Sequence, residues 1–245
     1  MKVVIIEGID NTGKTTVIHE LMNRYDRVYY MHATKPDETD PVKCAIEQKK
    51  YFHTMVEDIR RVEQSNLNVD LIILDRSWLG EYVYGCLYRG NGDEYVKDMI
   101  KECYEHLSRL TMRLAGLNFS TILYIASPEF CAKNDDGKSI SEGHIDAIAR
   151  ERERFIEILE SDAVIGKKCI INVEKDGEFL PKDEIFEMTM NVINDYRDSF
   201  SAKDMMYTQG KRNEELAPDY VPEGTNLNSD VPEEPEVTNI NSDGE

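Results

Sequence analysis

Eight residues near the N-terminus constrain the fold of this chain more than any other segment. Residues 8–15 read Gly-Ile-Asp-Asn-Thr-Gly-Lys-Thr, which fits the pattern Gly-x-x-x-x-Gly-Lys-Ser/Thr. The motif follows an apolar run at 3–6 and leads into residues with helical periodicity. Gly8 and Gly13 let the backbone approach phosphate oxygens without a Cβ in the way. Consecutive N–H groups and the start of the helix would then point at the anion, so we predict a phosphate-binding loop.

The side chains of this loop predict which nucleotide and which metal ion the protein binds. Lys14 can reach the β- and γ-phosphates of a nucleoside triphosphate, and the Thr15 hydroxyl can ligate a Mg²⁺ ion that bridges the same oxygens. We therefore expect ATP and Mg²⁺ as cofactors. The residues expected to hold the nucleotide are Gly8, Asp10, Asn11, Thr12, Gly13, Lys14, Thr15 and Thr16. The loop alone does not choose between a kinase, an ATPase and a GTPase.

Apolar runs and amphipathic stretches alternate along the chain. The runs are nearly continuous in Val, Ile and Leu, which is typical of parallel strands buried on both faces. Strands are predicted at 3–7, 27–31, 71–74, 121–126 and 169–173. Helices are predicted at 14–25, 41–65, 93–117, 141–160 and 182–198. This alternation predicts an α/β fold of three layers, the P-loop NTPase fold, with a five-stranded parallel sheet flanked by helices.

A second group of polar residues follows the buried run at 71–74. Asp75 and Arg76 come directly after it, where a parallel strand opens onto the ligand crevice beside the phosphate loop. The carboxylate can hold Mg²⁺ or orient a nucleophile, and the planar guanidinium can grip a phosphate. We expect Lys14, Arg76 and Asp75 to be catalytic, and Thr15 and Asp75 to serve the metal.

With these two motifs the chain resembles the thymidylate kinase family and, more loosely, the deoxynucleoside kinases. Glu7-Gly8-Ile9-Asp10 before Gly13-Lys14-Thr15-Thr16 is similar to the opening motif of the family, and Asp75-Arg76 is similar to its Asp-Arg pair. Weaker similarities are Thr34-Lys35-Pro36, Tyr84 and Ser127-Pro128-Glu129. The resemblance spans roughly residues 1 to 200 and implies transfer of a phosphoryl group from ATP to a deoxynucleoside monophosphate.

The resemblance also implies roles for individual residues. Asp10 would contact the sugar of the nucleotide, Arg76 would bind the acceptor phosphate, and Tyr84 would lie beside the base. The residues expected to bind the acceptor are Asp10, Lys35, Tyr51, Phe52, Arg76 and Tyr84. Aromatic residues such as Tyr51 and Phe52 are more often core residues than base platforms, so both readings stay open.

The sequence departs from the family on the acceptor side and in the lid. Thr54 stands about where the family has an arginine, and the expected lid at 133–138 lacks the family's string of arginines. Arg150 and Arg154 share one face of a predicted helix and could close over the phosphates instead. The alternative is a solvated helix face with alternating charges. Ser77 makes the second motif Asp-Arg-Ser, closer to the deoxynucleoside kinases.

The composition limits how many domains the chain can form and which kinds of partner it can bind. The 245 residues carry a net charge of −19, and residues 208–245 hold ten acidic and two basic residues with four of the eight prolines. We predict one kinase domain at 1–207, with a small lid around 130–150, and an acidic disordered tail at 208–245. The acidic body disfavours a nucleic-acid partner. No apolar run is long enough to span a membrane, so no membrane partner is expected.

Further expectations concern the cell and the assembly. Five scattered cysteines without a Cys-x-x-Cys pair fit reduced thiols, which together with the lack of a signal peptide predicts a cytoplasmic protein. The resemblance implies a small-molecule nucleotide as substrate and a homodimer.

Three functional hypotheses follow. The first is a kinase of a deoxynucleoside monophosphate. The second uses the same chemistry on a nucleoside or a hydroxymethyl pyrimidine, where a carboxylate such as Asp75 or Glu7 would act as base. The third, of another class, is a switch or regulatory module that hydrolyses nucleotide to drive a conformational change.

Overall fold

The fold is built on a five-stranded parallel sheet. The computed structural model describes residues 1–34, 36, 38, 40–65, 68–113 and 118–194. The strands are β1 (Lys2–Gly8), β2 (Val28–His32), β3 (Leu71–Asp75), β4 (Asn118–Ile125) and β5 (Lys167–Asn172). Their order in the sheet is β2-β3-β1-β4-β5, and all neighbours are parallel. The predicted three-layer P-loop NTPase fold is confirmed.

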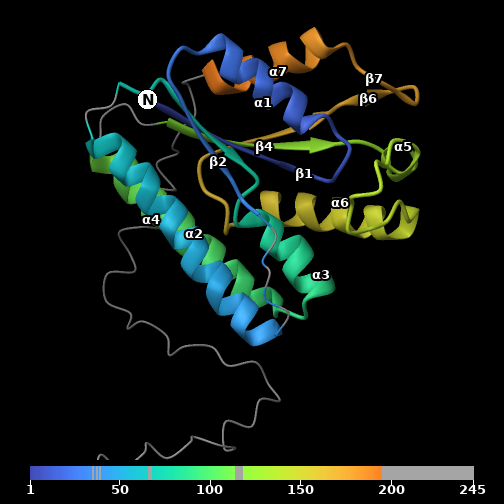
Figure 1. Cartoon of the computed structure of the whole chain (residues 1–245), viewed down its shortest axis with the longest axis horizontal. Helices are drawn as coiled ribbons and strands as arrows, with labels where there is room; N and C mark the ends of the chain where they lie inside the picture. The colour runs from blue at the N-terminus through green and yellow to red at the C-terminus, as the bar shows by residue number, and fades with distance from the viewer. Residues whose placement is uncertain (35, 37, 39, 66–67, 114–117, 195–245) are drawn as a thin grey trace, which may run out of the picture.

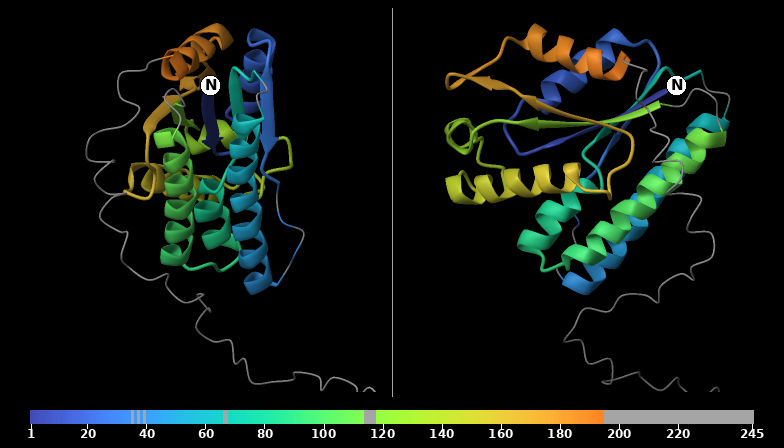
Figure 2. Two further views of the ribbon diagram at one scale, coloured as in Figure 1. Left: turned by 90° about the vertical axis from the view of Figure 1, so that its left-hand side faces the viewer. Right: turned by 180° about the vertical axis from the view of Figure 1, so that it is seen from behind.

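Helices cover both faces of this sheet (Figures 1 and 2). On one face lie α1 (Lys14–Arg24) and α7 (Lys182–Asn194). The other face carries the long pair α2 (Pro41–Gln64) and α4 (Asp93–Arg113), together with α6 (Ile145–Glu160). Short elements complete the described chain: η1 (Glu81–Gly85), α3 (Cys86–Tyr88), α5 (Pro128–Lys133) and a hairpin of β6 (Glu174–Lys175) and β7 (Glu178–Phe179).

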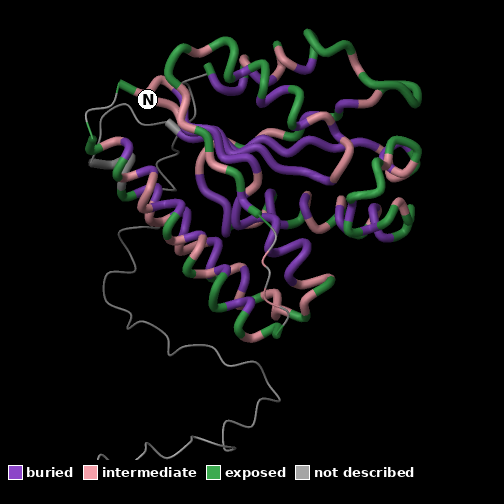
Figure 3. Tube along the Cα trace, viewed as in Figure 1, coloured by how far each residue is buried: buried purple, intermediate pink, exposed green. Residues whose placement is uncertain are grey.

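The core lies between the sheet and its helices, as the buried tube in Figure 3 shows. Residues 3–6 of β1 and 71–74 of β3 are at most 2% exposed. These are the continuous apolar runs of the sequence, and burial on both faces is the reason that they do not alternate with polar residues. Because β1 is the central strand and β3 is its neighbour, the loops that follow them lie side by side near the middle of the sheet edge.

The structure corrects several predicted boundaries and adds elements. β4 begins at Asn118 and not at 121, because 118–120 pair in register with Lys2, Val3 and Val4 of β1. The sequence there contains Asn and Ser, which have low strand propensity, so the pairing partner decides the boundary. The predicted helix at 141–160 begins only at Ile145. No prediction was made for η1, α5 or the β6–β7 hairpin, since each is too short to show a periodic pattern.

Some predictions fall outside the described residues. These are the ends of the helices predicted at 93–117 and 182–198, and the disordered tail predicted at 208–245. None of the helices in the described ranges combines the length and the apolar character that a membrane crossing requires.

Candidate active site

The phosphate loop connects β1 to α1 and has the backbone geometry that its sequence predicts. Gly8 and Gly13 have φ angles of 138° and 76°, and Asn11 takes a left-handed φ of 63°. Gly13 is the N-cap residue directly before α1, so the N–H groups of the first helical turn face the space above the loop. The Thr12 hydroxyl donates to the Ile9 carbonyl at 2.9 Å and fixes the loop from within.

Lys14 lies inside this loop. It is 7% exposed, and its Nζ donates to the Ile9 carbonyl at 2.5 Å and to the Thr12 hydroxyl at 3.4 Å. Burial, reinforced by the nearby Arg76, lowers the pKa of Lys14 to about 7. An anion bound in the loop would place further negative charge beside this ammonium, so phosphate binding and protonation of Lys14 should favour each other.

This coupling predicts a pH dependence of nucleotide binding. With a pKa of about 7, Lys14 is charged at pH 6 and about nine-tenths neutral at pH 8 in the free protein. We expect the affinity for Mg²⁺-ADP to fall about tenfold from pH 6 to pH 8, with uptake of about one proton per site at pH 8. Titration calorimetry at pH 8 in two buffers of different ionisation enthalpy measures that uptake. Equal binding enthalpies in both buffers would contradict a Lys14 pKa of about 7.

The Asp75-Arg76-Ser77 turn meets the phosphate loop at the end of β3. The Arg76 N–H donates to the Ile6 carbonyl of β1, and the Ser77 N–H donates to Glu7 Oε1 at 2.6 Å. Ser77 Oγ donates to the same carboxylate oxygen at 2.8 Å. Arg76 itself has a φ of 65°, which is strained for a residue with a Cβ. The buried Glu7 therefore holds the turn that aims Arg76.

Arg76 is the basic residue shared by loop and turn. Its guanidinium forms an ion pair with Asp10, donates to the Gly8 carbonyl at 3.3 Å and lies 3.5 Å from the Tyr84 hydroxyl. Its carbon Cζ is 5.6 Å from the centre of the Tyr84 ring. The structure thus brings together Asp10, Arg76 and Tyr84, which the sequence placed in three separate motifs.

Asp75 faces β2. Its Oδ2 accepts from the Tyr30 hydroxyl at 2.8 Å and lies 2.9 Å from His32 Nδ1. The other oxygen, Oδ1, has no hydrogen-bond partner among the described residues. The Thr15 hydroxyl is on an exposed residue of the first turn of α1. One hydroxyl and one carboxylate fit a Mg²⁺ ion whose other ligands are phosphate oxygens and water. In the described ranges no cluster of three acidic, His or Cys side chains could hold a metal by itself.

A cavity of about 270 Å³ opens beside Arg76. Four of the six residues expected to bind the acceptor line it: Asp10, Phe52, Arg76 and Tyr84. Tyr51 does not line it; its hydroxyl donates to the His32 carbonyl instead. Lys35 lies outside the described residues. Thr54 is exposed on α2 and donates to the Lys50 carbonyl.

An irregular helix determines the position of the Tyr84 side chain. It lies in the π-helical turn η1, stacks on Tyr88 with ring centres 6.4 Å apart, and meets Phe155 of α6 edge to face at 5.8 Å. π-helical turns are uncommon and are often found at functional sites. The turn directs Tyr84 toward Arg76 while keeping the ring 8% exposed.

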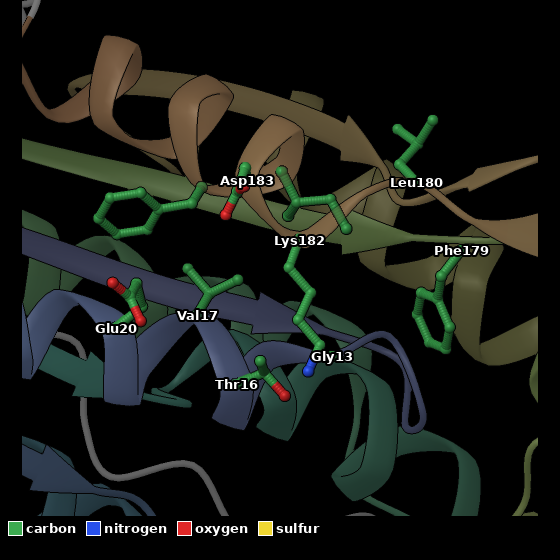
Figure 4. A pocket seen from close by; sticks show the side chains of 10 residues that line it. Gly13, Thr16, Val17, Glu20, Phe179, Leu180, Lys182 and Asp183 are labelled. Carbon is green, nitrogen blue, oxygen red and sulfur yellow. The ribbon is translucent and has the colours of Figure 1, made fainter.

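A second cavity of about 260 Å³ lies on the other side of the phosphate loop, between α1 and α7 (Figure 4). Its walls are mainly apolar, formed by Val17, Phe179, Leu180, Ile185 and Phe186. Gly13 and Thr16 of the loop line its end. Phe179 comes from β7 and is fixed by an edge contact with Phe130 of α5 at 4.6 Å. An apolar slot beside the loop suits a nucleotide base.

The arginines of α6 differ in their surroundings. Arg154 donates to Asp93 at 2.7 Å and to the Tyr82 carbonyl at 3.2 Å, and its Cζ lies 4.1 Å from the centre of the Tyr82 ring. It therefore ties α6 to η1 and α4 in this conformation. Arg150 lines neither cavity. Arg152 has a buried Nε without a hydrogen-bond partner among the described residues. Of the loop that follows α5, Asp135 accepts from Asn11 at 3.3 Å, and Lys138 lines the first cavity.

Several residues that line the first cavity were not predicted from the sequence. Glu81 is 3% exposed and accepts from Arg89 at 2.5 Å and from Asn91 at 2.6 Å. Burial raises the pKa of Glu81, and the pairing with Arg89 opposes this rise. Glu81, Arg89 and Gln48 of α2 all line the cavity. A carboxylate within an aromatic segment after the Asp-Arg pair was the one available signal.

Comparison with known proteins shows the fold of this chain. No protein-family model matches the sequence, and a search among curated proteins gives no match. Among solved structures, polyphosphate kinase 2 from Arthrobacter aurescens TC1 is similar with a TM-score of 0.55 and 12% identity, over 90% of this chain and 72% of that one. This likeness agrees with the P-loop fold described above.

Two further solved structures are similar with lower scores. Thymidylate kinase from Ehrlichia chaffeensis has a TM-score of 0.48 and 13% identity, over 78% of this chain and 97% of that one. The YorR protein of Bacillus subtilis, in complex with phosphorylated GDP, has a TM-score of 0.46 and 16% identity, over 77% of this chain and 96% of that one.

Proposed function

We propose that this chain is a Mg²⁺-dependent kinase that transfers the γ-phosphoryl group of ATP to a deoxynucleoside monophosphate. One observation carries the proposal: two cavities flank one phosphate loop, and Arg76 lines only one of them. A protein that only hydrolyses a nucleotide needs one such cavity. A kinase needs two, with its phosphate-binding residues between them.

The donor would lie on the α1 side. Its base enters the apolar cavity between α1 and α7, and its β- and γ-phosphates lie on the loop against Lys14. Mg²⁺, when bound there, neutralises phosphate charge. Thr15 and the Asp75 carboxylate would hold it.

The acceptor would lie in the cavity beside Arg76. Its phosphate would replace Asp10 as the ion-pair partner of the Arg76 guanidinium. The Asp10 carboxylate would then accept a hydrogen bond from a sugar hydroxyl. Phe52 and Tyr84 form walls of the space that the base would occupy. A monophosphate is already ionised at neutral pH, so this arrangement needs no general base. Glu7, a candidate for such a base, is buried, accepts from Ser77 through Oε1 and does not line this cavity.

A panel of acceptors tests this proposal. The full chain is incubated with Mg²⁺-ATP and each common nucleoside or deoxynucleoside monophosphate, the nucleosides themselves, and no acceptor. We expect ADP and a diphosphate product with at least one deoxynucleoside monophosphate, and little ADP without an acceptor. ADP formed at the same rate without an acceptor favours a switch, and product formed only from a nucleoside moves the acceptor to a sugar hydroxyl.

The variant Arg76→Lys sharpens this test. A lysine keeps the charge but loses the planar fork, so we expect the KM for the acceptor to rise tenfold to a hundredfold. The KM for ATP should change much less, because Arg76 does not line the donor cavity. An equal rise in both KM values would mean that Arg76 does not select the acceptor.

A further inference from the structure

Lys182 lies at the apolar cavity between α1 and α7, although no part of the sequence motifs includes it. It is the first residue of α7, and it lines the cavity together with Gly13 and Thr16. The other charged residues of the lining are Glu20 and Asp183, so Lys182 is the cationic side chain among the described residues that line this space.

The direction of this side chain is informative. Figure 4 shows Lys182 extending across the cavity with its ammonium toward Gly13 and Thr16, at the end of the phosphate loop. In the same view Asp183 lies above this ammonium and Glu20 lies to its left. The described residues give this ammonium neither an ion pair nor a hydrogen bond. An extended lysine whose charge points at a loop for anions, with no acidic partner, indicates that it meets an anion.

The position of Lys182 determines which phosphate it can meet. A nucleotide whose base fills the apolar cavity passes its sugar and its first phosphate over Gly13 and Thr16. Its later phosphates continue into the loop, where Lys14 is buried against the Ile9 carbonyl. Lys14 does not line the cavity, and Lys182 does. The two lysines therefore stand at different places along one polyphosphate chain.

We propose that Lys182 is a nucleotide-binding residue that pairs with the α-phosphate of the donor, together with the Thr16 hydroxyl. The inference rests on the proposed function only for the side of the loop that the donor occupies. The α-phosphate gains no charge during transfer, so this ion pair contributes to nucleotide binding and not to the chemical step. The binding partner class is any nucleotide with at least one phosphate.

The test compares Lys182→Ala with the unchanged protein in binding ADP, AMP and adenosine. Loss of a charge-assisted contact predicts that the affinity for both ADP and AMP falls about tenfold or more. The affinity for adenosine, measured by competition with ADP, stays the same. As a second readout, raising the salt concentration weakens ADP binding more steeply in the unchanged protein than in Lys182→Ala.

Lys175→Ala is the matched control, because Lys175 is an exposed lysine of the β6–β7 hairpin, which precedes α7, and it does not line the cavity. It should leave all three affinities and the salt dependence unchanged. The proposal is overturned if Lys182→Ala leaves ADP and AMP binding intact, or if it weakens adenosine by the same factor. Because no acceptor is present, these outcomes are separate from the kinase proposal: a chain without transfer activity can still show the effect.

Discussion

Replacing Lys14 with methionine is expected to reduce phosphoryl transfer about a thousandfold. Lys14 is the cation at the centre of the loop, where the bridging and γ-phosphate oxygens of the donor would gather charge as the bond breaks. Methionine fills nearly the same volume without a charge, so the change removes the electrostatic contribution and little else. The measurement is the steady-state rate with saturating Mg²⁺-ATP and the best acceptor of the panel.

The stability of this variant provides the control. Burial lowers the pKa of Lys14 from 10.5 in the unfolded chain to about 7 in the folded one. The charged form therefore costs stability in full below pH 7, and this cost disappears as the pH rises toward 10.5. Lys14→Met should be at least as stable as the unchanged protein, most clearly at pH 6. A variant that unfolds more easily at pH 6 would show that its lost activity reflects damage to the loop.

The fold was predictable because its decisive signals are local. The apolar runs of β1 and β3 are continuous, so each indicated a buried parallel strand without any knowledge of its partner. The glycine pattern at Gly8 and Gly13 fixed where the first strand ends and the first helix begins. The start of β4 was not predictable, because its first three residues form a strand only through their register with β1.

The sequence indicated the phosphate loop and the Asp-Arg pair more completely than it indicated the cavity beside Arg76. The loop and the Asp75-Arg76 pair follow directly from position along the chain. The residues that shape the cavity beside Arg76 do not, because Gln48 comes from α2, Glu81 comes from η1 and Arg89 follows α3. Their convergence depends on how α2 and the π-helical turn η1 pack. Lys182 was missed for the same reason, since only the tertiary fold places the start of α7 beside the phosphate loop.

Gly8→Ala is expected to destabilise the fold by about 3–5 kcal/mol, the combined cost of overpacking and of a forbidden backbone angle. Gly8 has a φ of 138°, and a Cβ built there would lie 2.1 Å from the Tyr124 carbonyl oxygen of β4. The clash is with backbone, which cannot rotate away as a side chain can. Relief requires β1 and β4 to separate at the residue pair where the phosphate loop begins.

The variant Gly177→Ala measures the cost of backbone strain without the steric clash that Gly8→Ala also introduces. Gly177 also has a positive φ, 77°, but a Cβ there would meet no atom within 4 Å. Its cost should be about 1 kcal/mol, that of a left-handed residue. Urea unfolding followed by circular dichroism measures both variants. If the two lose the same free energy, contact with β4 does not govern the choice of glycine at position 8. If Gly8→Ala loses several times more, this glycine is required by the sheet as well as by the phosphate, which joins the stability of the fold to the geometry of the site.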